Sequence, residues 1–491
     1  MLQLFTNTAK LPSQKNIAPT KATLGQYMTP PAIARFMSSL FTQRQGGELR
    51  LLDAGAGQGS LSCAFLQAWR EGRSAFSSGR VTLFEVDMAM LPALDASVSR
   101  ALSGLPAQHS IVHEDFVERA ALWALRGQRL YTHAILNPPY KKIHSQSRHR
   151  QFLRDVGIET GNLYAAFVAL ALTLLEPGGQ LVAIIPRSFC NGPYFREFRK
   201  YLLRFAAIRR IHLFDSRTKA FSDDKVLQEN CILTLERDTP QGDVVVSAST
   251  DATFSDMVEV KKPFTAIINP ADKEHFIHIS LDSESTQAPP FQASTLKELG
   301  LSVSTGPVVD FRLKEWLSPT PQQGDVPLLY PAHFNGHTCW PKADFKKPNA
   351  ICLCSETEKY LYPNGFYVVV RRMSSKEEAR RINAHVVDPA SFVGMEWLGF
   401  ENHLNVFHSH KQGLPEHLAW GTACYLNSSL VDTMFRRFNG HTQVNATDLR
   451  ALTYPPRTLL IRLGQWAESK RTMPSQEAID HRLEVLCREC Q

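Results

Sequence analysis

The chain has 491 residues, of which 43% are hydrophobic and 21% are charged. This is the composition of a soluble globular protein of two or three domains, and it excludes a disordered chain, a collagen-like chain and a disulfide-stapled module. The 54 Lys and Arg residues outnumber the 47 Asp and Glu residues, which gives a net charge of +7. This excess suits a polyanionic partner without identifying one.

The sequence indicates neither a membrane segment nor an export signal. No run of about 18 apolar residues occurs, and residues 1–15 lack the charged head and apolar stretch of a signal peptide. The nine cysteines are scattered, and the close pairs Cys352/Cys354 and Cys487/Cys490 have no second pair at zinc spacing. We therefore expect a cytoplasmic protein with reduced thiols, no metal and no membrane contact.

Short apolar segments alternate with helical stretches from about residue 49 to residue 237. Seven strands are predicted, over residues 49–53, 81–87, 109–116, 132–140, 180–186, 209–214 and 230–236. A helix is predicted over 162–176, where leucines recur at three- and four-residue spacing until Pro177, Gly178 and Gly179. Alternation of this kind predicts an α/β fold with a mostly parallel, seven-stranded sheet covered on both faces.

The pattern changes after about residue 240 to irregular segments that are richer in Pro, Asn and His. The polar segment 280–290 is typical of a linker. We therefore expect two domains, residues 1–280 and residues 281–491, the second with mixed structure.

A glycine-rich loop follows the first predicted strand and precedes a helix. Glycines let the backbone turn sharply and approach a ligand, whose polar end can meet the free N–H groups of the helix. Ser60 stands where the dinucleotide fingerprint needs its third glycine, which disfavours a nicotinamide cofactor. The loop residues expected to bind a ligand are Asp53, Ala54, Gly55, Gly57 and Gly59.

Two further strand ends carry acids. Glu85, followed by Val86, stands where a carboxylate can accept both hydroxyls of a ribose. Asp115 can accept an adenine amine, and Phe116 can supply an aromatic plate for its ring. Taken singly, such acids often only cap helices, but in this order they indicate an adenosine-type ligand across the strand ends.

The fourth strand ends in Asn137-Pro138-Pro139-Tyr140. Two prolines make the turn extended and rigid, so the Asn137 side-chain oxygen and the Pro138 carbonyl can face one amino group as two acceptors. Tyr140 can then stack on the ring that carries this amine. An exocyclic amine is a poor nucleophile, and two acceptors that draw its hydrogens out of the ring plane would restore lone-pair density for attack on a methyl sulfonium. The turn therefore predicts methyl transfer.

The order of glycine loop, acid, Asp-Phe and Asn-Pro-Pro-Tyr resembles the adenine-N6 DNA methyltransferases. More narrowly, the chain resembles the gamma group of type II restriction-modification systems, the TaqI and PstI kind, whose recognition domain is C-terminal. The resemblance implies a methyltransferase fold that binds S-adenosylmethionine in residues 1–280 and a target-recognition domain in residues 281–491.

The resemblance also assigns roles to residues outside the central motifs. Tyr27, Thr29 and Pro30 belong to a segment similar to the family's upstream motif, in which Thr29 and Pro30 help to hold the methionine part of the cofactor. Phe221 stands where the family has an aromatic residue against the extruded adenine. Less specific similarity continues at 304–306, 310–312, 371–377, 401–405 and 439–445.

Duplex DNA is the partner that the resemblance implies, with a restriction endonuclease that shares the recognition site, and we expect a monomer. Lys141, Lys142 and Arg148 follow the catalytic turn and suit backbone phosphates. A second basic cluster over 196–210 is equally typical of a solvated helix face. In the second domain Arg371, Arg372 and Asn445 are candidates for reading DNA, although 375–382 reads as a charged surface helix and Asn445 can equally cap a helix.

Two other functions stay open. Ribosomal-RNA and protein-glutamine N-methyltransferases also use Asn-Pro-Pro-Tyr, but they usually lack about 200 residues of C-terminal domain. A catalytically silent DNA-binding protein with this fold is disfavoured because Gly55, Asp115 and Asn137 are all intact.

Overall fold

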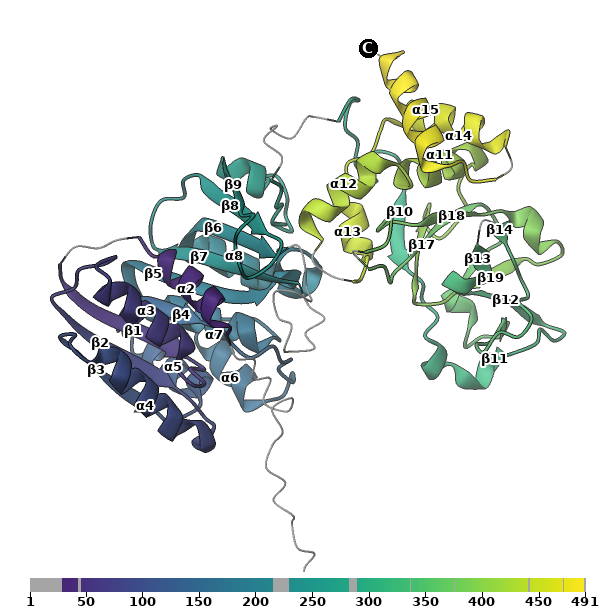
Figure 1. Cartoon of the computed structure of the whole chain (residues 1–491). Helices are drawn as coiled ribbons and strands as arrows, with labels where there is room; N and C mark the ends of the chain where they lie inside the picture. Colours follow the sequence, from purple (N-terminus) through teal and green to yellow (C-terminus); the bar gives the residue numbers. More distant parts are fainter. Residues whose placement is uncertain are drawn as a thin grey trace, which may run out of the picture.

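The computed structural model describes residues 29–42, 46–214, 229–281, 289–335, 337–375, 377–439, 442–470 and 472–489. Two of the predicted site residues, Tyr27 and Phe221, lie outside these ranges. The chain forms two lobes, one built from the first half of the sequence and one from the second (Figure 1).

The N-terminal lobe contains one sheet of nine strands in the order β3-β2-β1-β4-β5-β7-β6-β8-β9. All seven expected strands occur in it, and five neighbouring strands, β3 to β5 in the sheet order, run parallel. The expected count of seven is too low because β8 pairs with β6 and β9 pairs with β8, beyond the last predicted strand. The strands are β1 Glu48–Ala54, β2 Ser78–Phe84, β3 Ala107–Val112, β4 Tyr131–Leu136, β5 Leu175–Pro186, β6 Ala206–Phe214, β7 Asn230–Arg237, β8 Val244–Ser249 and β9 Val258–Lys262.

Helices cover both faces of this sheet, as the alternating pattern predicts. One face packs against α2, α3 and α4, and the other packs against α5, α6, α7 and α8. The helices are α2 Pro31–Ser39, α3 Ser60–Arg70, α4 Leu91–Leu102, α5 Phe116–Leu125, α6 Arg148–Asp155, α7 Leu163–Leu174, α8 Arg196–Phe205 and the short α10 Phe264–Ile267. The helix predicted over 162–176 ends at Leu174, before the Pro-Gly-Gly stop, because Leu175 already pairs with Tyr131 of β4.

The C-terminal lobe is mixed, with two main sheets and a layer of helices. The four-stranded sheet has the order β10-β20-β17-β18, the five-stranded sheet has the order β11-β15-β12-β19-β16, and β13 and β14 form a small hairpin. The strands are β10 Ser302–Thr305, β11 Leu317–Ser318, β12 Asp325–Leu329, β13 Phe334–Asn335, β14 His337–Thr338, β15 Ala350–Cys352, β16 Leu361–Pro363, β17 Tyr367–Arg371, β18 Ala384–Val387, β19 Trp397–Phe400 and β20 Leu404–His408. The helices are α11 Glu416–Leu426, α12 Ser429–Phe438, α13 Ala446–Arg450, α14 Arg457–Glu468 and α15 Gln476–Arg488.

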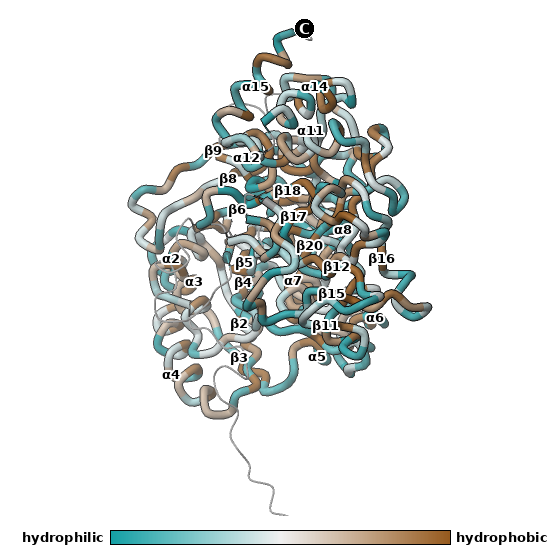
Figure 2. The backbone as a smooth tube through the Cα atoms, turned by 90° about the vertical axis from the view of Figure 1, so that its right-hand side faces the viewer, coloured by the Kyte–Doolittle hydropathy of each residue, from teal (hydrophilic) through white to brown (hydrophobic). Residues whose placement is uncertain are grey.

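The hydrophobic stretches of this lobe run through its middle, around β17, β18 and β20 (Figure 2). Its main core joins these strands to α11, α12, α14 and α15. The charged helix suggested over 375–382 does not form: the described part of this segment is an irregular loop. Its Arg381 is 2% exposed and donates hydrogen bonds to Ser374 Oγ and Asn439 Oδ1, which explains why the loop is held against the lobe.

The two lobes meet through hydrogen bonds between distant parts of the chain. The Arg187 guanidinium donates to the carbonyls of Arg436 and Arg437 at the end of α12, at 3.0 and 2.9 Å. Asn191 Nδ2 donates to Asp448 Oδ1 at 3.1 Å, and the Ile279 N–H donates to the Arg437 carbonyl. Among the helices of the described ranges, none is both long and apolar enough to cross a membrane.

Candidate functional site

The candidate site lies at one edge of the N-terminal sheet. Because β1, β2, β3 and β4 are parallel, their carboxyl ends meet at the same edge and bring together motifs that are up to about a hundred residues apart. The glycine loop follows β1, Glu85 follows β2, Asp115 lies beyond β3 and Asn137 follows β4.

The glycine loop has the backbone conformation that its residues predict. Gly55, Gly57 and Gly59 have φ values of 78°, 57° and 83°. The N–H groups of Gly55 and Ala56 both donate to the Phe84 carbonyl, which ties the loop to the end of β2. At Gly59, the N-cap of α3, an added Cβ would lie 3.0 Å from side-chain atoms of Leu94 and Val98. Both the positive φ and this close contact therefore disfavour any residue with a side chain at this position.

Asp53 is fully buried at the end of β1, next to Ala54. Its Oδ2 accepts hydrogen bonds from Ser62 Oγ and from the Ser62 N–H, at 2.7 and 3.3 Å. Burial raises the pKa of Asp53 from 3.8 to about 7, although the Ser62 hydrogen bonds oppose this rise. Its Oδ1 has no hydrogen-bond partner among the described residues, so one buried acceptor is left open beside the loop.

Glu85 bridges the loop and the end of β2. It is 4% exposed; its Oε2 accepts from the Gly57 N–H and its Oε1 accepts from the Asp87 N–H, each at 2.8 Å. A carboxylate oxygen can accept two hydrogen bonds, so both oxygens keep capacity for a pair of hydroxyls. Val86 is 50% exposed and offers an apolar surface next to this acid.

Asp115 caps α5 and also pairs with a histidine that the sequence did not single out. Its Oδ1 accepts from the Glu118 N–H at 3.1 Å, and its Oδ2 lies 3.0 Å from His149 Nε2 on α6. Burial alone would raise the pKa of Asp115, but hydrogen bonds from His149 and from backbone N–H groups hold it below its usual value. The same contact raises the pKa of His149. His149 lies 34 residues from Asp115 within a basic segment, and no local spacing connects the two.

The ring of Phe116 does not form the open plate that the sequence suggests. It is 2% exposed and packs edge-on against Phe84, with ring centroids 5.1 Å apart, and against Phe167 at 4.9 Å. The Phe116 ring is part of the hydrophobic core because α5, which begins at Phe116, packs on the sheet. A stacking role would require this ring to move.

The turn after β4 connects directly to the upstream motif. Asn137 Nδ2 donates to the Thr29 hydroxyl at 2.9 Å, so the Asn137 Oδ1 faces the opposite side. The Tyr140 hydroxyl donates to that Oδ1 at 3.2 Å and also lies 3.4 Å from the Ile184 carbonyl of β5. These contacts hold both ends of the Asn137 side-chain amide.

The prolines of the two motifs shape the backbone around this contact. Pro30 begins α2, its carbonyl accepts from the Ala34 N–H at 3.0 Å, and Thr29 is 7% exposed just before it. Pro138 is buried and Pro139 half-buried. Among the described residues, none donates a hydrogen bond to the Pro138 carbonyl, so this acceptor is available.

The basic residues divide into free and engaged groups. Lys141 and Lys142 are exposed, and the Arg148 side chain is 73% exposed, 3.4 Å from Glu118. In the second cluster Arg199 is fully buried and donates to main-chain carbonyls around Phe189 and Glu274, so this part of the cluster is structural. Lys141 and Lys142 therefore offer exposed cations next to the turn, and Arg148 is exposed there although it pairs with Glu118.

The candidate residues of the C-terminal lobe have different surroundings. Arg371 is one-third exposed and pairs with Glu378. The Arg372 guanidinium donates to the Asn402 carbonyl at 2.7 Å. Asn445 is the N-cap of α13, and its backbone N–H donates to Asp448 Oδ2 at 3.0 Å in a capping box, so it takes the helix-capping role that its position left open.

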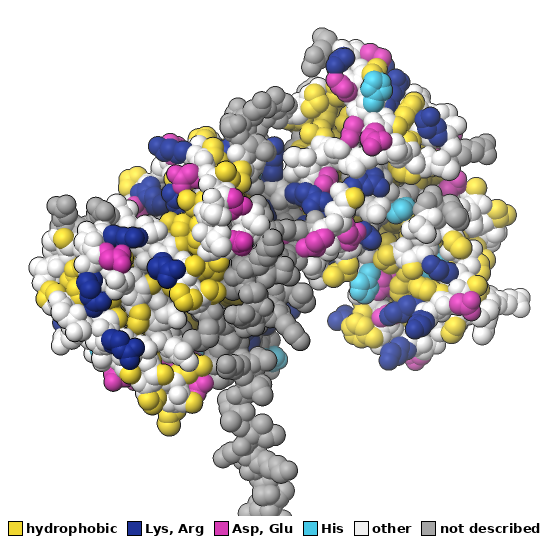
Figure 3. Space-filling model, in the orientation of Figure 1, with side chains coloured by type: hydrophobic (Ala, Val, Ile, Leu, Met, Phe, Trp, Pro, Cys, Tyr) yellow, Lys and Arg dark blue, Asp and Glu magenta, His cyan; other side chains and the backbone are white. Residues whose placement is uncertain are grey.

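Figure 3 shows a hollow beside the C-terminal lobe below the contact of the two lobes, and in Figure 1 α6 lies on the side of the N-terminal lobe that faces the C-terminal lobe. Basic, histidine and acidic side chains lie on the border of the C-terminal lobe that faces this hollow. The described residues contain no group of three or more His, Cys, Asp and Glu that could hold a metal ion.

Comparison with known proteins gives a consistent picture. Residues 107–221 match the Eco57I restriction-modification methylase family. The chain is 49% identical over 476 residues to the type II methyltransferase M.BsuBI of Bacillus subtilis, covering 95% of this chain and 94% of that protein. It is 42% identical over 469 residues to the type II methyltransferase M.PstI of Providencia stuartii, covering 92% of each.

Among solved structures, the fold resembles the type IIL restriction-modification enzyme MmeI in complex with DNA, with a TM-score of 0.53 and 11% identity over 93% of this chain and 71% of that one. It also resembles the DrdV–DNA complex, with a TM-score of 0.51 and 13% identity over 90% of this chain and 57% of that one. These likenesses extend over both lobes. Identity at this level to relatives of matching length shows that the chain belongs to the type II DNA methyltransferases of restriction-modification systems, whose methyl donor is S-adenosylmethionine.

Proposed function

We propose that this methyltransferase acts on the exocyclic N6 amine of an adenine that is extruded from duplex DNA at a specific sequence. The observation that carries the proposal is the Asn137 turn. Its side-chain amide is held between Thr29 and Tyr140 at the sheet edge where the glycine loop, Glu85 and Asp115 also meet.

The turn can activate an amine that is otherwise a poor nucleophile. The Asn137 Oδ1 and the Pro138 carbonyl accept the two N6 hydrogens, which localises the lone pair on the nitrogen. The cofactor supplies a methyl group bonded to a positively charged sulfur. The N6 lone pair forms the new N–C bond, the electrons of the S–C bond remain on sulfur, and N6 then loses one proton to solvent. Holding the two reacting atoms in line can contribute several kcal/mol, about 7 or more in favourable cases.

Extrusion of the adenine costs a few kcal/mol, about the same as stacking can return. A base stacked on an aromatic ring gains about 1–3 kcal/mol. Tyr140 is suited to this role because its hydroxyl contacts Asn137 and Ile184, which fixes the ring beside the acceptors. Phe221, the second expected stacking residue, lies outside the described residues and stays a prediction.

Several residues fit an S-adenosylmethionine molecule along the strand ends. The open Asp53 Oδ1 and the side-chain-free backbone at Gly55, Gly57 and Gly59 leave room and an acceptor for its polar end. Glu85 suits the ribose hydroxyls, and Asp115 suits the adenine amine. In this assignment Thr29 and Pro30 contact the methionine part, and Val86 contacts the adenine ring.

The division of labour follows from the same assignment. Residues 1–280 bind the cofactor and catalyse the transfer, and residues 281–491 recognise the target. Lys141, Lys142 and Arg148 contact DNA phosphates, and Arg371 contacts DNA from the other lobe, whereas the engaged Arg372 and Asn445 are weaker candidates. We further propose that the protein acts as a monomer alongside an endonuclease that cuts the same sequence.

The first experiment offers labelled S-adenosylmethionine with unmodified duplex DNA, transfer RNA, ribosomal RNA and a release-factor protein. We expect label on DNA alone, with N6-methyladenine as the only new base on digestion. Label on RNA or protein but not on DNA would refute the proposal and favour the amide or RNA methyltransferases that share this turn.

The second experiment replaces Asn137 by Ala. The transfer rate should fall by at least about a hundredfold, as when a comparable catalytic hydrogen-bonding group is removed. Cofactor binding, measured by calorimetry, should stay within a few-fold of wild type. Tyr140→Phe serves as the matched control, because it keeps the ring and should lose far less activity. A near-normal rate in Asn137→Ala would contradict the two-acceptor mechanism.

A further inference from the structure

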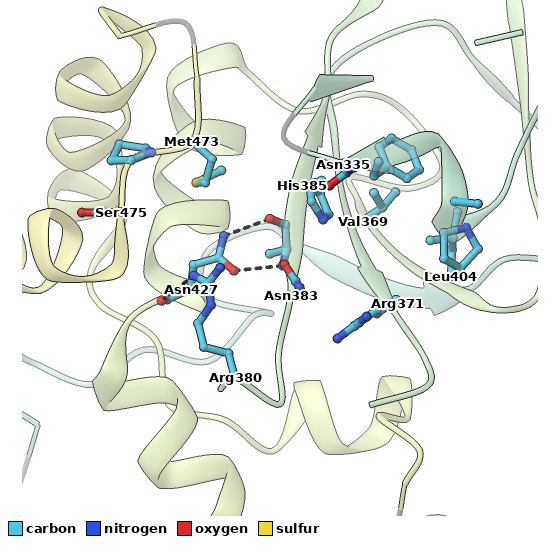
Figure 4. A pocket seen from close by; sticks show the side chains of 15 residues that line it. Asn335, Val369, Arg371, Arg380, Asn383, His385, Leu404, Asn427, Met473 and Ser475 are labelled. Carbon is cyan, nitrogen blue, oxygen red and sulfur yellow. Dashed lines mark hydrogen bonds between the residues drawn. The ribbon is translucent and has the colours of Figure 1, made fainter. Parts of the chain in front are cut away.

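The C-terminal lobe contains a cavity of about 630 Å³, and of the residues that line it Arg371 alone was given a role above. It lies between the strands β17 and β18, the β13 hairpin, the turn after α11 and the segment that precedes α15 (Figure 4). A volume of this size is in the range that holds small organic ligands.

Polar side chains face this cavity without protein partners. Among the described residues, none forms a hydrogen bond with the side chain of Asn335, Asn383 or His385. The Nε of Arg371 is buried and also has no partner in the described part of the chain. Buried polar groups in proteins are nearly always hydrogen-bonded, so the buried Nε of Arg371 is an unused donor at this cavity. The more accessible side chains of Asn335, Asn383 and His385 line the same space and can contact a polar ligand there.

The cavity also carries net positive charge. Arg371 and Arg380 both line it, and Figure 4 shows them on the lower side of the same space. Arg371 is paired with Glu378, and Arg380 donates to the Asn427 carbonyl at 3.3 Å, so one positive charge is uncompensated. An anionic group on the ligand would balance this charge, and arginine forks suit phosphate in particular.

The opposite wall suits a flat heterocycle. His385 stacks on Phe334 with ring centroids 5.7 Å apart and an interplanar angle of 27°. Burial and then the charges of Arg380 and Arg371 lower the pKa of His385 to about 4, so the ring is neutral at pH 7 and offers one donor and one acceptor. Asparagine amides present a donor and an acceptor side by side, as a base edge does.

From these features we infer that the cavity binds a nucleotide, with its phosphate at Arg371 and Arg380 and its base edge at Asn335, Asn383 and His385. Arg371 also lines an adjoining shallower cavity of about 400 Å³, together with Lys347, Met373 and His403. The nucleotide-sized cavity is thus next to a surface with basic side chains. The ligand is either a nucleotide displaced from bound DNA or a free mononucleotide, which share this chemistry.

The test uses the full-length protein with excess S-adenosylhomocysteine, which fills the cofactor site. The probes are 5-iodo-deoxyuridine monophosphate, free or placed at successive positions of a cognate duplex, followed by irradiation and peptide mapping. We expect crosslinks to the peptides that contain Asn335 or Asn383 and His385. Crosslinks from the duplex identify displaced DNA as the source, and crosslinks from the free nucleotide alone identify a mononucleotide.

Two pocket variants, Asn383→Leu and His385→Leu, should each reduce these crosslinks at least tenfold while thermal unfolding stays close to wild type. His481→Leu on the exposed face of α15 is the matched control and should change nothing. Two independent variants keep the test valid if one of them unfolds. Absence of crosslinks to these peptides from both probes, or crosslinks that both variants leave unchanged, would overturn the inference.

Discussion

Thr29 and Asn137 are joined by one hydrogen bond across the candidate site, and its removal should slow methyl transfer. Thr29→Val keeps the shape of the side chain but replaces the hydroxyl that accepts from Asn137 Nδ2 at 2.9 Å. Thr29 is 7% exposed, so solvent cannot readily replace this acceptor. The Asn137 amide would then lose its contact with Thr29 and keep its contact with Tyr140.

The size of the effect follows from the cost of losing a hydrogen bond that solvent cannot readily replace. With the Thr29–Asn137 hydrogen bond unmade beside the poorly exposed Thr29 side chain, this cost is about 1–3 kcal/mol. The Asn137 amide can avoid this cost by rotating to another arrangement. Catalysis needs the original orientation, so restoring it adds the same free energy to the barrier for methyl transfer. A loss of about 1–3 kcal/mol corresponds to a rate reduction of about 5- to 150-fold.

The assay measures kcat, the KM for S-adenosylmethionine and the KM for DNA in parallel. Because Thr29 acts here through Asn137, we expect the main loss in kcat. Thr29→Ser keeps the hydroxyl and should remain within about threefold of wild type, which separates the hydrogen bond from the lost methyl group. Thermal unfolding of both variants reports any general loss of stability.

Two results would refute this reasoning. A wild-type kcat in Thr29→Val would show that the hydrogen bond does not orient Asn137 during catalysis. A rise in the KM for S-adenosylmethionine with unchanged kcat would assign Thr29 to the cofactor alone, as the resemblance to relatives first suggested.

Three further predictions concern stability. Gly421→Ala should destabilise the protein by about 3 kcal/mol, because the added Cβ would overlap the Leu460 carbonyl where α11 and α14 touch. Gly242→Ala is the control, because its Cβ would make only ordinary van der Waals contact. Equal melting temperatures of the two variants would contradict the close approach of the helices. The pKa of Asp53 rises from 3.8 to about 7 on folding, so the folded state holds an extra proton and the free energy of unfolding falls as pH rises between these values. Asp53→Asn should therefore be more stable than wild type at pH 8 but not at pH 4. Denaturant unfolding measures this, and parallel pH profiles of the two proteins would refute it. Asp115 raises the pKa of His149 above 6.5, so the His149–Asp115 pair stabilises the fold fully below pH 6.5 and less as pH rises through the pKa of His149 in the folded state. His149→Ala should therefore lower the free energy of unfolding more at pH 5.5 than at pH 9. A loss of the same size at both pH values would count against the pair.

Local patterns in the sequence determined much of the N-terminal lobe. Periodicity located all seven predicted strands, because a buried parallel strand needs a short continuous apolar run. The glycine loop was equally predictable, because Gly55, Gly57 and Gly59, at alternate positions, all have a positive φ that favours glycine. Glu85 and Asn137 were identified because each directly follows a strand of the same parallel sheet, and Asp115 because it lies three residues beyond the end of another.

Local patterns were less informative wherever long-range packing competes with propensity. The charged segment 375–382 has good helix formers, yet the buried Arg381 binds Ser374 and Asn439 and holds the segment as a loop. Phe116 follows a strand end as a stacking residue would, yet the core takes its ring. In both cases the deciding contacts are made with residues distant in the sequence.

Neighbouring residues specify which chemical groups the site contains, because strand ends, glycine turns and the Asn137 turn are local features of the chain. The pairing of these groups depends on the folded sheet. The hydrogen bonds from Asn137 to Thr29 and from His149 to Asp115 join residues that are 108 and 34 positions apart. Sequence periodicity reports on local structure and does not predict contacts at such separations. Contacts of this kind form only when the sheet brings its strand ends together, which is why they had to be read from the folded chain.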